Sequence, residues 1–200
     1  MEIALGRDAA PELAVSLPLG AGRLTRSYLP DDPPTQLQLD QLREYVKATL
    51  REVADRLRWE GEPSKVVATS KTFKQLARLA GAAPQRKGPF VRRRLYRDDI
   101  ARWIPRLAEM PAAERARLRG VSASRSRQIV AGAIVAKCAM QALNVDEVEV
   151  CPWGLREGII LQHLQALSDP WVLPLQPIRP GHEAVGSRVA DVREIGVTRR

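Results

Sequence analysis

The sequence predicts a protein of the α/β class. Short apolar runs typical of strands alternate along the chain with longer segments whose apolar residues recur every three or four positions, as they do in amphipathic helices. The chain has 200 residues, 44% of them hydrophobic, which is enough for one compact domain with a true core but too few for two large lobes. We therefore expect a single domain, although this alternation alone does not fix its topology.

The chain is expected to begin inside a sheet. Glu2–Gly6 and Leu13–Leu17 are short apolar runs on either side of a gap that contains Pro11, and this pattern predicts a β-hairpin with its turn in the gap. The glycine-punctuated run Leu19–Thr25 then predicts a tight turn and a brief helix that stops at Pro30.

A long amphipathic helix follows an acidic, proline-bearing turn at Asp31 and Asp32. Thr35 is suited to cap the helix, because its hydroxyl can accept a hydrogen bond from a backbone amide of the first turn. Gly61 and Pro63 are expected to end this helix, which we interpret as scaffold. Its apolar face consists of Leu39, Leu42, Val46, Leu50, Val53 and Leu57.

The next segment combines a strand, a polar turn and a helix. Lys65–Ala68 predicts a short buried strand, and Phe73, Leu76 and Leu79 mark the helix that follows. A helix N-terminus offers unpaired N–H groups and a favourable dipole to an anion, and hydroxyls and a cation add charge-assisted hydrogen bonds. The alternative is that Thr69 or Ser70 only caps the helix. The polar turn, a candidate phosphate site, consists of Thr69, Ser70, Lys71 and Thr72.

The remaining elements are mainly helical. We expect a loop at Gly81–Pro89, then a helix at about Asp98–Met110 and another after Pro111, of which Ala112–Leu118 form the middle. A helix at Ser124–Leu143, closed by Asn144, comes next. A strand (Val148–Val150), a turn (Cys151 and Pro152) and a final helix (Trp153–Leu167) complete the series. Residues 168–200 contain four prolines and few regular apolar spacings, so we expect a mostly irregular tail outside the site. The predicted domain is therefore residues 1–167.

The chain is strongly basic, with a formal charge of +9. A basic surface attracts polyanions, so the candidate partners are nucleic acid, anionic lipid and polyphosphate. Six basic residues crowd one short segment: Arg86, Lys87, Arg92, Arg93, Arg94 and Arg97. A run of this kind is ordinarily a solvated loop.

The sequence shows neither a membrane span nor a signal peptide, so we expect a soluble, cytoplasmic protein. Cys138 and Cys151 have no CxxC partner, and we expect both to be buried as small apolar side chains. His163 and His182 lack a nucleophile at suitable spacing, and no GxxxxGK[ST] or GxGxxG motif occurs, which disfavours a self-contained nucleotide hydrolase.

A second candidate phosphate contact is Arg156, which follows the strand ending at Val150 and lies on the first turn of the final helix. The alternative is an ordinary surface pair of Arg156 with Glu157.

Four stretches in unbroken order resemble the second half of the Ppx/GppA phosphatases, most closely the second exopolyphosphatase type of actinobacteria. They are Ser16–Thr25 (SLPLGAGRLT), Ala68–Phe73 (ATSKTF), Gly120–Ala133 (GVSASRSRQIVAGA) and Cys151–Gly158 (CPWGLREG). The resemblance covers residues 1–167. It implies the second lobe of an actin-like, ribonuclease-H-like fold with a mixed sheet and flanking helices, and phosphate bound in the cleft between two lobes.

The resemblance also implies roles for individual residues. Glu2 corresponds to the terminal acid of a Gly-Gly-Gly-Ser-x-Glu loop that would help to hold Mg²⁺. Thr69, Ser70 and Thr72 fall on a phosphate loop usually written Gly-Thr-Ser-Gly-Thr, in which Ala68 and Lys71 replace the glycines here. Lys71 adds a cation to this loop, and the loss of the glycines narrows the approach of its backbone to a ligand. Arg156 falls on a Gly-Leu-Arg-Glu-Gly motif, where a structural role and a phosphate contact both stay open.

The general-base glutamate of the family is expected upstream of Met1, so no catalytic residue is assigned in this chain. We expect an exopolyphosphatase lobe that binds inorganic polyphosphate but does not hydrolyse it alone. The alternatives are hydrolysis of guanosine pentaphosphate (pppGpp) by the full-length enzyme, and a non-catalytic polyphosphate-binding fragment. A missing N-terminal lobe and a homodimer are candidate partners. Nucleic acid is disfavoured because no recognised motif occurs and only 4% of the residues are aromatic.

Overall fold

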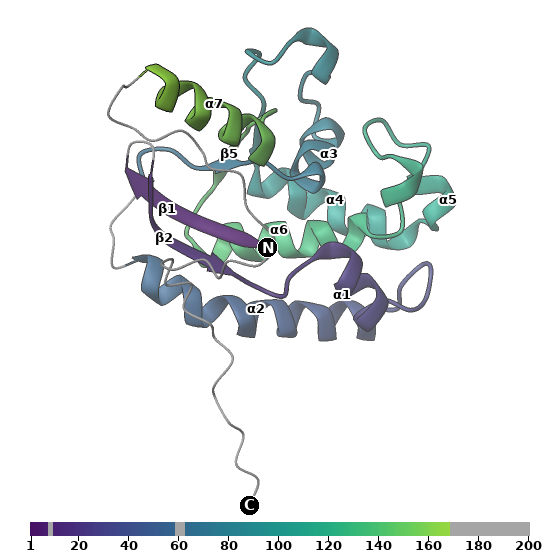
Figure 1. Cartoon of the computed structure of the whole chain (residues 1–200). Helices are drawn as coiled ribbons and strands as arrows, with labels where there is room; N and C mark the ends of the chain where they lie inside the picture. Colours follow the sequence, from purple (N-terminus) through teal and green to yellow (C-terminus); the bar gives the residue numbers. More distant parts are fainter. Residues whose placement is uncertain (8–9, 59–62, 169–200) are drawn as a thin grey trace, which may run out of the picture. The chain divides into compact units, whose positions relative to one another are not determined.

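The computed structural model describes residues 1–7, 10–58 and 63–168 of the chain (Figure 1). The chain divides into two compact units, one comprising Met1 and Leu17–Gly158 and the other comprising Glu2–Ser16 and the residues from Ile159 onward. The limits of the predicted domain, residues 1–167, stay a prediction. The predicted irregular tail lies outside the described residues, apart from Ser168, which ends the last helix.

The core of the first unit is built around helix α6 (Ile129–Ala142). Its residues are apolar on nearly every side, and a helix of that composition must be covered all round. Four helices pack on it: α1 (Ala21–Tyr28), α2 (Gln36–Arg58), α3 (Lys71–Leu79) and α4 (Arg97–Glu109). Figure 1 shows α6 lying between α2 and α4.

A mixed three-stranded sheet completes this unit, in the order β3 (Val67–Ala68), β5 (Glu147–Val150) and β4 (Arg94–Tyr96). β3 runs parallel to β5, and β4 runs antiparallel to it. The α/β class with a mixed sheet and flanking helices is therefore confirmed. Sequence reasoning missed β4, because a strand of three residues with one buried side chain, Leu95, is too short to show alternation.

The predicted N-terminal hairpin is confirmed and belongs to the second unit. β1 (Glu2–Arg7) pairs antiparallel with β2 (Ala10–Ser16), and a bulge lies between Leu5 and Gly6. β2 begins earlier than Leu13, so Pro11 lies within the strand rather than in the turn. The predicted turn residues Asp8 and Ala9 fall outside the described residues.

Helix ends follow local side-chain chemistry. Thr35 Oγ1 accepts a hydrogen bond from the Gln38 amide (3.4 Å) and Gln38 Oε1 accepts one from the Thr35 amide (3.2 Å), so the predicted cap of α2 is confirmed as a capping box. The residues that were expected to end α2 lie partly outside the described range. Asn144 adopts a left-handed conformation (φ 54°) after α6, as expected for a terminating residue.

Two helices are shorter than predicted. α5 (Ala112–Arg115) gives way to tighter i→i−3 turns that lead to Gly120, whose φ of 99° a side chain would oppose. α6 begins at Ile129 rather than Ser124, because Ala123–Arg125 form a 3₁₀ turn and Ser126 Oγ donates back to the Ala123 carbonyl.

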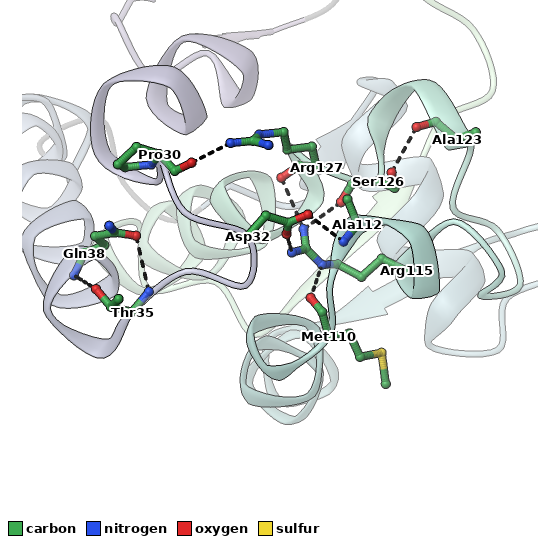
Figure 2. A network of polar contacts seen from close by, with 10 residues as sticks. All are labelled: Pro30, Asp32, Thr35, Gln38, Met110, Ala112, Arg115, Ala123, Ser126 and Arg127. Carbon is green, nitrogen blue, oxygen red and sulfur yellow. Dashed lines mark hydrogen bonds and ion pairs between the residues drawn. The ribbon is translucent and has the colours of Figure 1, made fainter.

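A buried ion pair fastens the turn before α2 to the α5 region (Figure 2). Arg115 is 1% exposed; its guanidinium binds Asp32 and donates to the carbonyls of Met110 (2.8 Å) and Ser126 (2.8 Å). Asp32 also accepts from the Ala112 amide (2.8 Å) at the start of α5. The acidic turn predicted at Asp32 is thus a structural junction.

None of the described helices is both long enough and apolar enough to cross a membrane. Cys138 is buried as predicted, whereas Cys151, which follows the last residue of β5, is only half-buried; both thiols are free.

Candidate functional site

The two segments predicted to bind phosphate leave the same edge of the sheet. β3 and β5 are parallel neighbours with Ala68 opposite Val150, and the Cys151 amide donates to the Ala68 carbonyl (2.9 Å) just beyond the strand ends. The chain continues from β3 into α3 and from β5 into α7 (Leu155–Ser168). Ligands of parallel α/β sheets bind outside the carboxyl ends of adjacent strands, where these two loops lie.

At the N-terminus of α3, one backbone amide is capped by a side chain and two backbone amides are free. Ser70 Oγ accepts from the Phe73 amide (3.2 Å), so Ser70 is the N-cap and the capping alternative holds for this residue. In the described part of the chain, no hydrogen bond uses the amides of Lys71 and Thr72. These amides point out of the start of a nine-residue helix and suit an anion.

The side chains of Thr69 and Lys71 are exposed at this helix start. Among residues 1–7, 10–58 and 63–168, neither side chain forms a hydrogen bond or an ion pair, so a hydroxyl and an ammonium group are available beside the free amides. The predicted anion site is thus compatible with the structure at Thr69 and Lys71, while Ser70 is occupied as a cap.

Thr72 is held by packing rather than by hydrogen bonding. A Cβ atom added to Gly132 of α6 would lie 2.5 Å from Thr72 Cγ2 and 3.5 Å from Ala21 Cβ, so α6 needs glycine here to admit both neighbours. This close approach fixes the start of α3 against α6. It also brings α3 near the start of α1, where Gly20 is an N-cap without a side-chain hydrogen bond.

Sequence reasoning did not predict that the start of α1 lies near the start of α3. The run containing Gly20 and Gly22 predicted a helix start, and it was not included among the candidate site residues. The available signal was the absence of a capping side chain in a glycine-rich turn, which leaves the first amides of a helix open.

In the loop after β5, a backbone amide donates a hydrogen bond to a carboxylate three residues further along the chain. Glu157 Oε2 accepts from the Gly154 amide (2.7 Å), and this hydrogen bond is the largest cause of the lowered pKa of Glu157. Arg156 is exposed, and no described contact brings it to Thr69–Thr72. The link between the two loops is Lys74, whose Nζ donates to the Pro152 carbonyl (2.7 Å). Sequence reasoning did not identify Lys74.

Glu2, the predicted metal ligand, is exposed at the start of β1 opposite Ser16 and belongs to the other unit. Within the described residues, no group of three or more His, Cys, Asp and Glu side chains could hold a metal ion. The assignment of Glu2 as a ligand of Mg²⁺ stays a prediction.

The arginine-rich segment is not the solvated loop that its composition predicted. Arg93 is only 4% exposed, because its guanidinium donates to four carbonyl groups of the preceding loop. Arg94 lies in β4 and pairs with Glu147 (3.1 Å), and Arg97 pairs with Asp146 (2.5 Å). Only part of the run is free at the surface.

Comparison with known proteins decides the family. The model of the Ppx/GppA phosphatase family matches residues 1–167. This chain belongs to the Ppx/GppA phosphatase family. Exopolyphosphatase 1 of Mycobacterium tuberculosis is 47% identical to it over 192 residues, which are 96% of this chain and 56% of the relative. Exopolyphosphatase 1 of Mycobacterium leprae is 45% identical over 179 residues, which are 90% and 53% of the two chains.

Solved structures of Ppx/GppA proteins share the fold. An Aquifex aeolicus family member superposes with a TM-score of 0.72 at 26% identity, covering 84% of this chain and 54% of that one. An exopolyphosphatase from Cytophaga hutchinsonii gives 0.70 at 18% identity over 82% and 53% of the two chains. The predicted lobe of an actin-like fold is confirmed.

The chain spans about half the length of the curated Ppx/GppA relatives it matches. Those relatives are named exopolyphosphatase 1, so the finer likeness to the second actinobacterial type stays a prediction.

Proposed function

We propose that this chain is the phosphate-facing lobe of an exopolyphosphatase, which releases the terminal phosphate of inorganic polyphosphate by hydrolysis. The observation that carries the proposal is the placement of the open α3 N-terminus at the ends of two parallel strands, beside the loop that follows β5. Membership of the Ppx/GppA family and relatives named exopolyphosphatase 1 support it.

The chemistry assigned to this lobe is binding and charge stabilisation. The amides of Lys71 and Thr72, the Thr69 hydroxyl and the Lys71 ammonium group would hold oxygens of the terminal phosphate through charge-assisted hydrogen bonds. Water would attack the terminal phosphorus in line, and the bond to the bridging oxygen would break, leaving its electron pair on the shortened chain. These donors would offset the negative charge that develops on the transferred group.

A divalent cation fits the proposal through one residue. Glu2 offers a hard carboxylate oxygen, the ligand type that Mg²⁺ prefers, and we propose it as a ligand of that ion. Bound Mg²⁺ would neutralise charge on the phosphate oxygens. The glutamate that activates water is expected in the half of the relatives that this chain does not span. This lobe alone is therefore expected to bind polyphosphate without turning it over.

Exposed apolar side chains on α7 support a protein partner. Ile160 is 58% exposed and Leu167 is 64% exposed, an arrangement that ordinarily marks an interface. The proposed partner is the other lobe of the family fold. If this face instead joins two copies of the chain, sedimentation will show a homodimer that the added lobe does not dissociate.

The proposal is tested by phosphate release from polyphosphate with Mg²⁺, comparing this chain with a version extended upstream to include the first lobe. We expect activity only in the extended protein, and a Lys71→Gln substitution should raise its KM. Lys65→Gln is the matched control, because Lys65 pairs with Glu149 (3.1 Å) before β3 rather than facing the α3 N-terminus. An inactive extended protein would favour a non-catalytic binding fragment, whereas preferential inhibition by guanosine pentaphosphate would favour that substrate.

A further inference from the structure

Basic side chains surround Arg78 in the last turn of α3, away from the helix start described above: Arg119 and Arg86 lie near enough to lower its pKa, and Lys87 follows Arg86 in the chain. They come from α3 itself, from the 3₁₀ turn Gln85–Lys87 and from the turn before Gly120. A Cβ atom added to Gly120 would lie 2.3 Å from Arg78 Cβ, so the last of these turns packs directly against α3. We name this group the α3 basic cluster: Arg78, Arg86, Lys87 and Arg119.

The loop that carries Arg86 and Lys87 is built around the buried Arg93. The Arg93 guanidinium donates to the carbonyls of Ala83 (2.9 Å), Pro84 (2.8 Å), Gly88 (3.0 Å) and Val91 (2.7 Å). These four bonds fold the loop back on itself and leave the side chains of Arg86 and Lys87 in solvent. Two exposed cations are therefore presented on a pre-organised loop, which lowers the entropy cost of binding an anion.

The positive charge of the cluster is not balanced locally. In the part of the chain that the structure describes, Arg86, Lys87 and Arg119 form no ion pair, in contrast to Arg94 and Arg97. Desolvation, followed by the charges of Arg119, Arg86 and Arg93, lowers the pKa of Arg78. Like charges held this close favour an anionic ligand that would separate and neutralise them.

A polar stripe on α3 joins the cluster to the proposed phosphate site. Lys71, Gln75 and Arg78 follow one another at i, i+4 and i+7 and so share one face of the helix. Gln75 Nε2 donates to Ser122 Oγ (2.9 Å), which adds a hydroxyl beside this stripe. A nine-residue helix is about 13 Å long, a distance that a ligand with several linked phosphates can follow.

We propose that the α3 basic cluster binds the inner phosphates of a polyphosphate chain whose terminal phosphate lies at the N-terminus of α3. The inference rests on the proposed function and extends it, because it makes affinity depend on the length of the chain. A short polyphosphate would reach only the helix start, whereas a long one would engage both ends of α3.

Single-stranded nucleic acid is the competing polyanion. It binds through exposed aromatic platforms as well as through cations. One such side chain, Phe90, lies in the same loop, but its ring already stands edge-on to Trp153 with 6.2 Å between the ring centroids. Polyphosphate needs only the cations and is therefore favoured.

The test measures binding of long-chain polyphosphate and of tripolyphosphate to this chain at several salt concentrations. The cluster variant is R86Q/K87Q/R119Q. The control R51Q/R102Q/R106Q also removes three positive charges, but from exposed positions on α2 and α4. The cluster variant should bind long polyphosphate about tenfold more weakly, with a salt slope lower by about 2 to 3, because each lost phosphate contact removes about one unit. Its affinity for tripolyphosphate, and both affinities of the control, should change by less than about twofold.

Each other outcome overturns a specific statement. Loss of long-chain affinity that is equal in the two variants would overturn the inference and leave the proposed function standing, because only net charge would matter. No binding of either phosphate by the unaltered chain would overturn both. Tighter binding of a mixed-sequence single-stranded DNA than of polyphosphate at equal salt, lost in the cluster variant, would make this surface a nucleic-acid site instead.

Discussion

Arg115 and Arg93 are both buried, but their guanidinium groups have different kinds of hydrogen-bond partners. Arg115 pairs with the carboxylate of Asp32, 83 residues away in the chain, and donates to carbonyls on both sides of α5 (Figure 2). Arg93 has no carboxylate partner among the described residues, and its four acceptors all lie within ten residues of it. The first arrangement joins distant segments, so it should govern global stability. The second shapes one loop, so it should govern local order and binding.

The largest effect is expected from Arg115→Met. Burial is the largest influence on the pKa of Arg115 and lowers it, despite the opposing effect of Asp32, so the pair is held at a desolvation cost. Removing one partner leaves the other charge and several carbonyls unsatisfied, and we expect a loss of about 3 to 5 kcal/mol in the free energy of unfolding. Urea denaturation followed by circular dichroism measures it.

The double variant D32N/R115M sharpens this expectation. If the two residues act as a pair, the double variant should lose less stability than the two single variants summed. The exposed i,i+3 pair of Arg102 with Asp99 is the control, because R102Q should cost no more than about 1 kcal/mol. A strictly additive double variant would show that Asp32 and Arg115 stabilise the fold independently.

Arg93→Met should have a smaller and more local effect. Loss of hydrogen bonds from a charged donor costs about 1.5 to 3 kcal/mol, and the loop carbonyls released here lie near solvent, which favours the low end. Hydrogen exchange should quicken in the Ala83–Val91 loop while α6 stays protected, and long polyphosphate should bind more weakly. An unfolding penalty as large as that of Arg115→Met would contradict the contrast drawn between the two residues.

The two arginines also mark where sequence reasoning succeeds and where it fails. The hairpin, α2 with its Thr35 cap, and α3 follow from periodicity and capping, which are local properties of the chain. The burial of Arg93, the strand at Arg94–Tyr96 and the pairing of Asp32 with Arg115 depend on residues that meet only in the fold. Charge alone therefore predicted a solvated loop and an ordinary acidic turn.

The candidate site shows the same division. The strand, turn and helix around Thr69–Thr72 were readable from the sequence, and so was the cap at Ser70. The approach of α6 through Gly132 and the link from Lys74 to the Pro152 carbonyl were not, because both join segments at least 60 residues apart. The family motif left both a structural role and a phosphate contact open for Arg156, and the structure neither joins it to the α3 loop nor decides between the two.

Gly132→Ala is expected to have a modest effect on stability and a measurable one on binding. The added methyl would lie 2.5 Å from Thr72 Cγ2, an overlap that costs about 1 to 3 kcal/mol. Inside a helix, alanine is more favourable than glycine by up to about 1 kcal/mol, which offsets part of this cost. The net loss in the free energy of unfolding should therefore be near 1 kcal/mol. Displacement of Thr72 should weaken tripolyphosphate binding, measured by calorimetry.

Gly22→Ala provides the matched control. Its methyl would approach the end of the flexible Gln128 side chain (2.8 Å) and make an ordinary contact with Arg26 (3.9 Å), so we expect little loss of stability and unchanged tripolyphosphate affinity. Equal weakening by the two substitutions would indicate that α1, rather than Thr72, carries the contact.

The smallest effect on stability is expected at Glu157, whose charge is exposed, whereas those of the two arginines are buried. Its pKa lies below the usual value of 4.5 because the Gly154 amide donates to the carboxylate. A lowered folded-state pKa means that this stabilisation is present above about pH 4.5 and is lost as the pH falls through the lower folded value. The Gly154 amide resonance should therefore titrate below pH 4.5, with little change in global stability. A midpoint at or above 4.5 would show that this cap does not persist in solution, and the first turn of α7 would then offer its amides, beside Arg156, to an anion.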